Sequence, residues 1–274
     1  MRIVIFYFSG TGNTKWVADR MANALTANGK DAESISIEAI SKNDIPSMID
    51  AADMVGFAYP IYGSDIPEPM KAFMTALPQQ NTEKPTFVFC TQMMFSGDGA
   101  FVFRKELKSK DYRIVYSEHY MMPNNISMFS WLPLYGKRLH AFCLKHTEKR
   151  INRIAKQIAL GKKHVHIRMG YVFGIMQRAP FRQSFEKNNK GRDALGVNES
   201  RCISCERCAR ICPVNNIIMQ GKHPEWQGKC ILCTRCYNFC PTGAITYNGK
   251  SHILKHPLYT GPENTFKPEQ LKKR

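Results

Sequence analysis

The sequence is poor in acidic residues and contains no long apolar run. Its 274 residues include 39 Lys and Arg but only 22 Asp and Glu, which gives a formal net charge of +17. The apolar stretch at residues 1–8 is short and leads into a glycine-rich turn, so it lacks the features of a signal peptide. No window approaches the roughly 20 apolar residues that cross a bilayer. We therefore expect a cytoplasmic protein without a transmembrane segment.

The ten cysteines are placed in a way that argues against a disulfide framework. Eight of them lie between Cys202 and Cys240, at spacings of three and four residues. In a reducing compartment such a cluster indicates metal binding. The other two, Cys90 and Cys143, stand alone, and we expect each to be a small buried apolar side chain.

The first 160 residues alternate short apolar runs with helical patterns, which is typical of a parallel sheet covered by helices. We expect strands at residues 2–8, 33–37, 53–59, 85–91 and 113–120, and helices at 13–28 and 147–160. The fold class expected is α/β: a five-stranded doubly wound parallel sheet followed by a small C-terminal α+β unit. The expected domains are residues 1–162, a basic linker at 163–197, the small unit at 198–250, and a basic tail at 251–274 that is extended or wraps over a domain.

The small unit is built from a repeat with a period of 28 residues. The segment 202–213 reads Cys-Ile-Ser-Cys-Glu-Arg-Cys-Ala-Arg-Ile-Cys-Pro, and 230–241 reads Cys-Ile-Leu-Cys-Thr-Arg-Cys-Tyr-Asn-Phe-Cys-Pro. Soft thiolates suit zinc or iron–sulfur clusters. Zinc sites usually show two cysteine pairs with a longer gap, whereas this spacing is typical of two 4Fe–4S clusters that exchange their fourth ligand. One cluster is thus assigned to Cys202, Cys205, Cys208 and Cys240, and the other to Cys230, Cys233, Cys236 and Cys212.

A glycine-rich turn follows the first expected strand and opens directly into a helix. It consists of Ser9, Gly10, Thr11, Gly12, Asn13 and Thr14. Free backbone N–H groups and hydroxyls at such a turn can bind a phosphate group. The turn is neither a Walker A loop nor a dinucleotide fingerprint, because Lys15 stands where those motifs need other residues.

Two further loops are expected at the same edge of the sheet, where ligands of doubly wound folds bind. They contribute the remaining candidate cofactor-binding residues: Pro60, Ile61, Tyr62 and Gly63 after the third strand, and Thr91, Gln92, Met93, Ser96 and Gly97 after the fourth.

These motifs resemble a known family. Residues 8–14 (Phe-Ser-Gly-Thr-Gly-Asn-Thr) and 122–125 (Met-Pro-Asn-Asn) are similar to flavodoxins. Together with residues 209–213 they make the whole chain similar to the flavodoxin–ferredoxin fusions of anaerobic bacteria and archaea, the EFR1-type ferredoxins. The resemblance implies non-covalent FMN, with Ser9, Thr11, Asn13 and Thr14 at its phosphate. It also implies that residues 60–63 flank the flavin ring, with Tyr62 stacking, and that residues 91–97 close the other side.

The positive charge is concentrated between the two expected domains. Residues 137–192 contain fifteen Lys and Arg against two acids, Glu148 and Glu186. We call this segment the basic belt. It indicates an acidic partner, and we expect an acidic redox protein such as a ferredoxin, a flavodoxin or an oxidoreductase. A solvated face without a partner is the plain alternative.

The function expected is electron transfer, by a carrier that relays electrons between low-potential partners through the clusters and FMN. An FMN-dependent oxidoreductase that reduces a quinone, a disulfide or a flavin is the alternative. For it, the aromatic loop with Phe129, Trp131 and Tyr135 would form or block a pocket over the flavin. A redox sensor or nucleic-acid binder is a third reading, but the belt has no recognisable nucleic-acid fold. Oligomerisation is left open.

Overall fold

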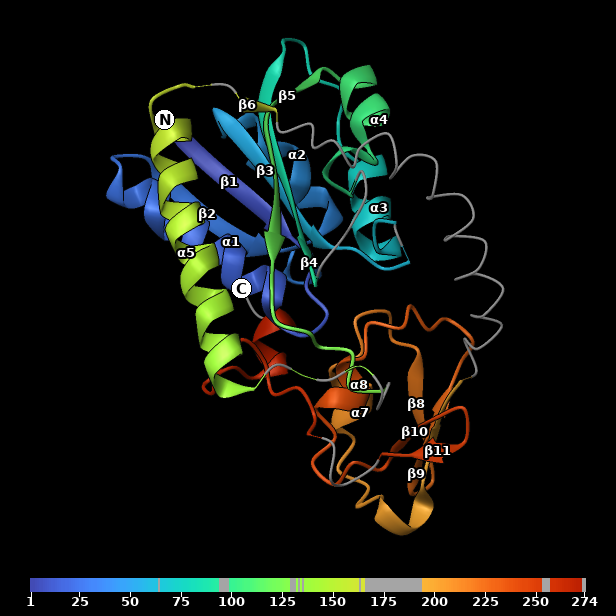
Figure 1. Ribbon diagram of the computed structural model, residues 1–274. Coiled ribbons are helices and arrows are strands. Elements are labelled where there is room, and N and C mark those ends of the chain that lie inside the picture. The colour runs from blue at the N-terminus through green and yellow to red at the C-terminus, as the bar shows by residue number, and fades with distance from the viewer. Residues whose placement is uncertain are drawn as a thin grey trace.

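The protein forms an α/β unit and a smaller unit packed beneath the carboxyl ends of its strands (Figure 1). The computed structural model describes residues 1–63, 65–93, 99–128, 132, 134, 136–162, 194–252 and 257–272, and the backbone of 164–165. Among these residues no helix is both long and apolar enough to cross a membrane. Ser96, Gly97, the three aromatic residues of the 129–135 loop, and most of the basic belt beyond residue 162 lie outside the described residues.

The larger unit is a parallel sheet whose strand order is β2-β1-β3-β4-β5-β6. Its strands are β1 (Arg2–Tyr7), β2 (Asp31–Ser36), β3 (Met54–Pro60), β4 (Lys84–Gln92), β5 (Tyr112–Met121) and β6 (His164–Val165). All five expected strands are confirmed, and their order is that of a flavodoxin-like fold. The two-residue β6 pairs in parallel with β5 and extends the sheet by one strand.

Helices cover both faces of this sheet, which explains why β1, β3 and β4 in its centre read as continuous apolar runs. In Figure 1, α1 (Asn13–Ala27) and α5 (Lys137–Ala159) lie on one face. The opposite face carries α2 (Ile45–Asp50), α3 (Glu68–Thr75) and α4 (Arg104–Ser109). Along β1, Ile3 and Ile5 belong to the core under α1 and α5, whereas Val4 and Phe6 belong to the core on the other face. The isolated Cys90 and Cys143 are both buried, as expected.

Helix α5 is longer than the sequence pattern predicts. It begins at Lys137, ten residues before the expected start at residue 147. The apolar periodicity is weak in this first part because Leu139 and Phe142 are exposed on its surface while Cys143 is buried. The first part of α5 therefore depends on the helix propensity of its residues and on the burial of Cys143, and its apolar pattern alone does not reveal it.

The smaller unit contains two copies of one supersecondary element, a short helix followed by two strands. The strands β7 (Leu195–Val197), β10 (Ile245–Tyr247) and β11 (Lys250–Ser251) form an antiparallel sheet, and β8 (Ile217–Gln220) pairs with β9 (His223–Trp226) in a hairpin. The short helices α7 (Arg207–Arg210) and α8 (Arg235–Asn238) are 28 residues apart. Strand β7 pairs with β10, so the sheet joins residues on both sides of the cysteine segment.

The C-terminal tail returns to the α/β unit, as expected of a segment that wraps over a domain. It ends in the 3-10 helix η6 (Pro268–Lys272), close to η1 (Ile37–Ala39) of the α/β unit. Leu271 is fully buried in the core beneath α1 and α5. Its carbonyl oxygen accepts a hydrogen bond of 2.5 Å from the hydroxyl of Ser36 at the end of β2. The tail is thus part of the folded structure.

Candidate cofactor sites

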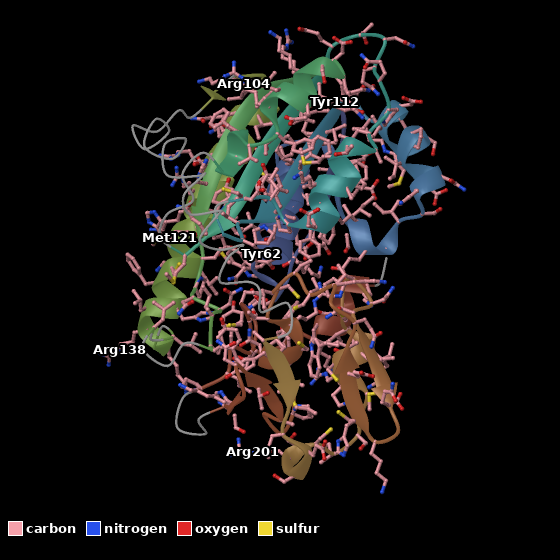
Figure 2. All side chains as sticks on the ribbon, turned by 90° about the vertical axis from the view of Figure 1, so that its right-hand side faces the viewer. Tyr62, Arg104, Tyr112, Met121, Arg138 and Arg201 are labelled. Carbon is pink, nitrogen blue, oxygen red and sulfur yellow. The ribbon has the colours of Figure 1, made fainter. Side chains whose placement is uncertain are left out.

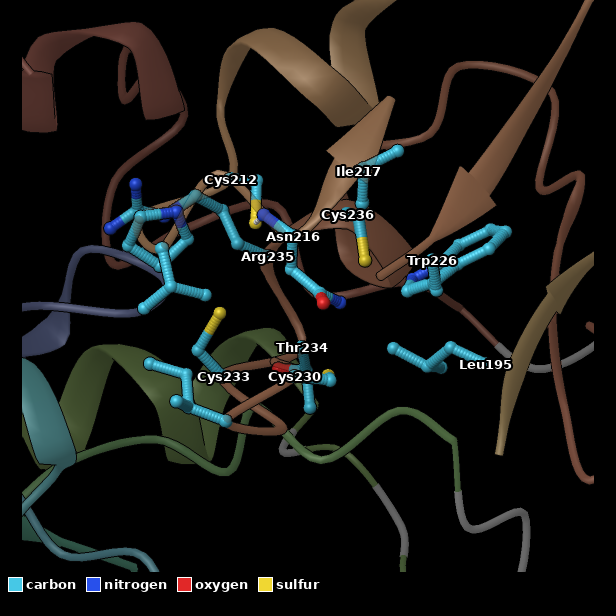
Figure 3. A pocket seen from close by; sticks show the side chains of 13 residues that line it. Leu195, Cys212, Asn216, Ile217, Trp226, Cys230, Cys233, Thr234, Arg235 and Cys236 are labelled. Carbon is cyan, nitrogen blue, oxygen red and sulfur yellow. Dashed lines mark hydrogen bonds between the residues drawn. The ribbon is translucent and has the colours of Figure 1, made fainter. Parts of the chain in front are cut away.

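The eight clustered cysteines surround two separate cavities in the smaller unit. One is lined by the thiols of Cys212, Cys230, Cys233 and Cys236 (Figure 3). The other is lined by those of Cys202, Cys205, Cys208 and Cys240. Each cavity therefore receives three cysteines from one copy of the repeat and the fourth from the other copy.

The backbone around these cysteines repeats as closely as the sequence does. Non-glycine residues with positive φ flank the second cysteine of each copy: Ser204 and Glu206 in the first, Leu232 and Thr234 in the second. Positive φ is unfavourable for such residues and persists only where the surrounding structure requires it. Here it curls three successive thiols around one cavity.

Backbone N–H groups donate to the fourth cysteine of each copy. The N–H of Asn216 lies 3.2 Å from the Cys212 sulfur, and the N–H of Ala244 lies 3.2 Å from the Cys240 sulfur. These are equivalent positions in the repeat. Hydrogen bonds of this kind orient metal-bound sulfur and tune the reduction potential of a cluster.

Burial raises the pKa of three of these thiols, those of Cys208, Cys233 and Cys236. It raises the pKa of Cys233 to about 12 and that of Cys208 to about 11, from 9.0. A soft metal cation would be needed to hold them as thiolates.

The thiols suit a cluster better than a single ion. No three Cys, His, Asp or Glu side chains of the described part of the chain converge closely enough to hold one metal ion. The indole N–H of Trp226 also lines the cavity of Cys212 and is buried without a protein partner among the described residues (Figure 3). It is a donor available to cluster sulfur. The donor set therefore fits a 4Fe–4S cube with several sulfur atoms, and fits a mononuclear zinc site poorly.

The second candidate site lies where the strands of the α/β unit end. The turn after β1 meets β4 and the loop after β5 through buried polar side chains. The hydroxyls of Thr14 and Thr91 are 2.8 Å apart, and the Asn125 amide donates to the Thr11 hydroxyl at 2.5 Å. The N–H of Gly12 donates to the hydroxyl of Ser9 at 3.1 Å. Ser9, Thr11, Asn13 and Thr14 are all buried at this point.

The start of α1 is suited to an anion. Gly12 has a φ of +103°, which glycine adopts readily, and no side chain in the described structure caps the helix. The first N–H groups of a helix have no partner within it, and the helix dipole adds a positive potential there. A phosphate at residues 9–14 would satisfy these groups.

The loop after β3 lies beside this turn. Tyr62 and Asp65 exchange two backbone hydrogen bonds of 3.0 Å around Gly63, and the N–H of Ile61 donates to the Thr91 carbonyl oxygen at 3.3 Å. The hydroxyl of Tyr62 is buried with no partner in the described part of the protein. Burial raises its pKa well above the ordinary value, so it stays a protonated donor. Gln92 and Met93 follow at the end of β4, partly buried. The uncapped helix fits the phosphate of a bound FMN, whereas the Tyr62 hydroxyl lies against Gly10 at the contact with Cys233.

The smaller unit is packed directly on the turn at residues 9–14, at the junction where Tyr62 lies (Figure 2). The guanidinium of Arg235, which is fully buried, donates to the carbonyl oxygens of Gly10 at 2.8 Å and Ser9 at 2.7 Å. It also forms a bidentate ion pair with Glu38, at 2.6 and 2.8 Å. The carbonyl oxygen of Cys233 would lie 2.9 Å from any Cβ at Gly10, so the turn has no room for a side chain there.

Sequence reasoning missed several residues of this junction. Asn125 belongs to the Met-Pro-Asn-Asn motif, which was a usable signal. Nothing in the sequence marked Glu38. Nothing distinguished Arg235 either, because Arg207 occupies the equivalent position in the other copy of the repeat. The tail residue Tyr259, whose hydroxyl donates to the Asn13 side-chain oxygen, was equally invisible.

Comparisons with known proteins match the two units separately. A family model described as a flavodoxin domain matches residues 4–118, and one described as a 4Fe-4S dicluster domain matches residues 201–245. A curated relative, NAD(P)H-quinone oxidoreductase subunit I of Gloeobacter violaceus, is 32% identical over 77 residues. That match covers 26% of this chain and 36% of the relative, so the chain spans about a third of its length.

Solved flavodoxin structures are similar to the larger unit. A flavodoxin from the domain Archaea is 15% identical with a TM-score of 0.39, covering 58% of this chain and 99% of that chain. The two-electron reduced flavodoxin of Megasphaera elsdenii is 22% identical with a TM-score of 0.41, covering 57% of this chain and 98% of that chain.

Proposed function

We propose that this chain, which joins a flavodoxin domain to a 4Fe–4S dicluster domain, is an electron carrier that relays electrons between low-potential redox partners. The observation that best supports this role is the packing of the Cys233 loop on the turn at Gly10. Two kinds of redox site are thereby held together in one chain. Transfer between them is intramolecular and needs no second encounter.

The residues that would hold the groups follow from the two sites. Two 4Fe–4S clusters would be bound by Cys202, Cys205, Cys208 and Cys240, and by Cys212, Cys230, Cys233 and Cys236. FMN would be bound by residues 9–14 at its phosphate, with residues 60–63, Thr91, Gln92 and Met93 at the ring. When bound, the clusters take up single electrons and FMN takes up one or two, which makes the chain a junction between one- and two-electron chemistry.

The chain's own residues would position these groups. Residues with positive φ flank the second cysteine of each copy, and backbone N–H groups donate to the sulfur atoms of Cys212 and Cys240. The hydroxyls of Thr11 and Thr14 are buried and already oriented by Asn125 and Thr91. A preorganised site reduces the rearrangement that accompanies each change of charge.

The described part of the basic belt offers a place for a partner. Helix α5 exposes six basic side chains, those of Lys137, Arg138, Lys145, Lys149, Arg153 and Lys156. Such a surface would attract an acidic redox protein, as expected for a cytoplasmic relay of the EFR1 type. Rates of exchange with an acidic ferredoxin should fall as salt is added, because screening weakens attraction between exposed charges. Salt-insensitive exchange would count against the belt.

Cofactor analysis with anaerobic spectroelectrochemistry tests the proposal. We expect about eight irons and one flavin per chain, with flavin and cluster potentials close enough for reversible exchange. Zinc in place of iron would end the proposal. Flavin potentials far above those of both clusters would instead indicate a terminal reductase.

A further inference from the structure

The two copies of the cysteine repeat are alike in sequence but differ in what surrounds them. We propose that they have separate roles in electron transfer, an inference that rests on the proposed function. The cavity of Cys212, Cys230, Cys233 and Cys236 is the proximal site, which exchanges electrons with the flavin. The cavity of Cys202, Cys205, Cys208 and Cys240 is the distal site, which exchanges electrons with an external protein. Arg235 is the positioning residue, because it fixes which of the two cavities lies next to the flavodoxin domain.

Arg207 and Arg235 occupy equivalent positions and make one equivalent contact. Arg207 donates to the carbonyl oxygen of Phe239 at 3.3 Å, and Arg235 donates to that of Ile211 at 2.8 Å. Phe239 and Ile211 each precede the fourth cysteine of the other copy. Each arginine therefore ties the two copies together in the same way, and this is its role inside the unit.

The remaining donors of the two arginines have different partners. The remaining donors of Arg235 bind the flavodoxin domain, at Ser9, Gly10 and Glu38. Together with the bond to Ile211, they satisfy all five N–H groups of this fully buried guanidinium. Within the described part of the chain, the remaining donors of Arg207 reach only Glu269 of the tail, and the Arg207 side chain is 30% exposed. A planar fork with five donors can satisfy this many acceptors, which a lysine cannot.

Apolar and cysteine side chains show the same asymmetry. Ile231, in the second copy, packs against the flavodoxin core together with Tyr62, whereas its counterpart Ile203 is 61% exposed. Cys233 is buried, and its counterpart Cys205 is exposed. The unit therefore docks by one copy and presents the other to solvent.

The position of the two copies agrees with this polarity. In Figure 2, Tyr62 lies where the two units meet, and Arg201, next to Cys202, lies at the far end of the smaller unit. The exposed Cys205 and Ile203 follow Arg201 in the chain, so another protein can come close enough to this copy for electron transfer.

One electron leaves a reduced one-electron donor protein for the distal site, passes to the proximal site, and then to the flavin. Two such passages, with protons taken from water, reduce one flavin and leave two donor molecules oxidised. Flow in the reverse direction uses the same order of sites.

The test compares Arg235→Gln, Arg235→Lys and Glu38→Gln with the matched control Arg207→Gln, all as anaerobic holoproteins. A reduced viologen serves as external donor, and cluster and flavin absorbance are followed separately after rapid mixing. We expect flavin reduction by the clusters to slow at least tenfold in the first three variants, with cluster reduction by the viologen unchanged. The Arg207→Gln variant should transfer to the flavin within about twofold of the unaltered protein.

Hydrogen exchange supplies a readout that does not depend on electron transfer. Protection of residues 9–14 should fall in Arg235→Gln and stay unchanged in Arg207→Gln, which should instead loosen the tail. Equal effects of the two arginine substitutions on rate and protection would overturn the assignment, and so would a rate unchanged in all three test variants. An unaltered holoprotein whose clusters never reduce its flavin would end the proposed relay itself.

Discussion

The hydroxyl of Tyr259 donates a hydrogen bond to the side-chain oxygen of Asn13, although 246 residues separate the two along the chain. Both side chains are buried, and the Asn13 amide in turn donates to the carbonyl oxygen of Pro123 at 3.0 Å. Pro262 and Phe266 of the tail lie directly over Gly12. The tail, the turn at residues 9–14 and the loop after β5 are therefore joined by both polar and apolar contacts.

This relationship predicts that Tyr259→Phe weakens both stability and flavin retention. Removing the hydroxyl leaves the buried Asn13 oxygen without its donor, at a cost of about 1–3 kcal/mol in the free energy of unfolding. We expect flavin to dissociate more readily as Asn13 loses its fixed orientation. Anaerobic urea unfolding and flavin titration measure the two effects.

Tyr112→Phe is the matched control for this prediction. The Tyr112 hydroxyl is also buried and donates to the Pro78 carbonyl oxygen at 3.0 Å, but far from the turn. It should lower stability by a similar amount and leave flavin affinity unchanged. If both substitutions weakened flavin binding equally, the specific role of Tyr259 would be wrong.

A pH dependence follows from Glu263 in the tail. Hydrogen bonds from the Trp16 indole, and from Arg20, hold the pKa of this carboxyl below its ordinary value of 4.5. A carboxyl whose pKa is lower in the folded state stabilises the fold above the ordinary value, and this stabilisation is lost as the pH falls through the folded pKa.

The unaltered protein should therefore be more stable than Glu263→Gln at pH 7, and the difference should vanish as the pH falls from 4.5 through the lower pKa of the folded state. The difference is expected to be small because the carboxylate is 44% exposed. Thermal unfolding at each pH measures it. A stability difference that is independent of pH would show that the carboxylate charge is not what holds the tail.

The exchange of the fourth ligand between the two copies predicts an unusual pattern in cysteine variants. Cys205→Ala and Cys240→Ala should each lower the iron content from about eight to about four per chain, since both remove the same cluster. The double variant of these two should keep about four irons, whereas Cys205→Ala with Cys233→Ala should keep almost none. Iron analysis after anaerobic purification gives the answer.

Cys90→Ala is the control, because its thiol is buried in the flavodoxin core and touches neither cavity. Its iron content should be unchanged. Loss of both clusters from the Cys205→Ala/Cys240→Ala variant would mean that each copy supplies its own fourth ligand.

The buried ion pair of Arg235 with Glu38 predicts non-additive stability effects. Replacing either residue alone by methionine leaves the other charge buried and unpaired, at a cost of about 3–5 kcal/mol. The double replacement should cost less than the sum of the two single ones, because no charge then remains. Denaturant unfolding of the four proteins measures the coupling, and strict additivity would contradict a direct pairing.

Local patterns were sufficient for most of the fold. The strands β1, β3 and β4 are buried on both faces, so their apolar runs are long and unmistakable, and α1 shows a clear apolar face that ends before Gly29. The cysteine spacing is likewise local, since three cysteines of each cavity lie within seven residues of the chain. The first ten residues of α5 escaped prediction because their apolar side chains are partly exposed.

The junction between the domains could not be predicted, and the reason is the repeat. Arg207 and Arg235 are equivalent in sequence and in their contact with the opposite copy. Only the docking of one copy on Ser9 and Gly10 makes them different, and that choice depends on surface complementarity over long chain separations. A single sequence contains no local signal for it.

The central claim is that the flavin and the clusters exchange electrons within one chain. Rapid anaerobic reduction of the clusters, followed by flavin absorbance over a tenfold range of protein concentration, tests it most directly. The account predicts a first-order transfer rate that is independent of concentration. A rate proportional to concentration, or clusters that stay reduced beside an oxidised flavin, would contradict it.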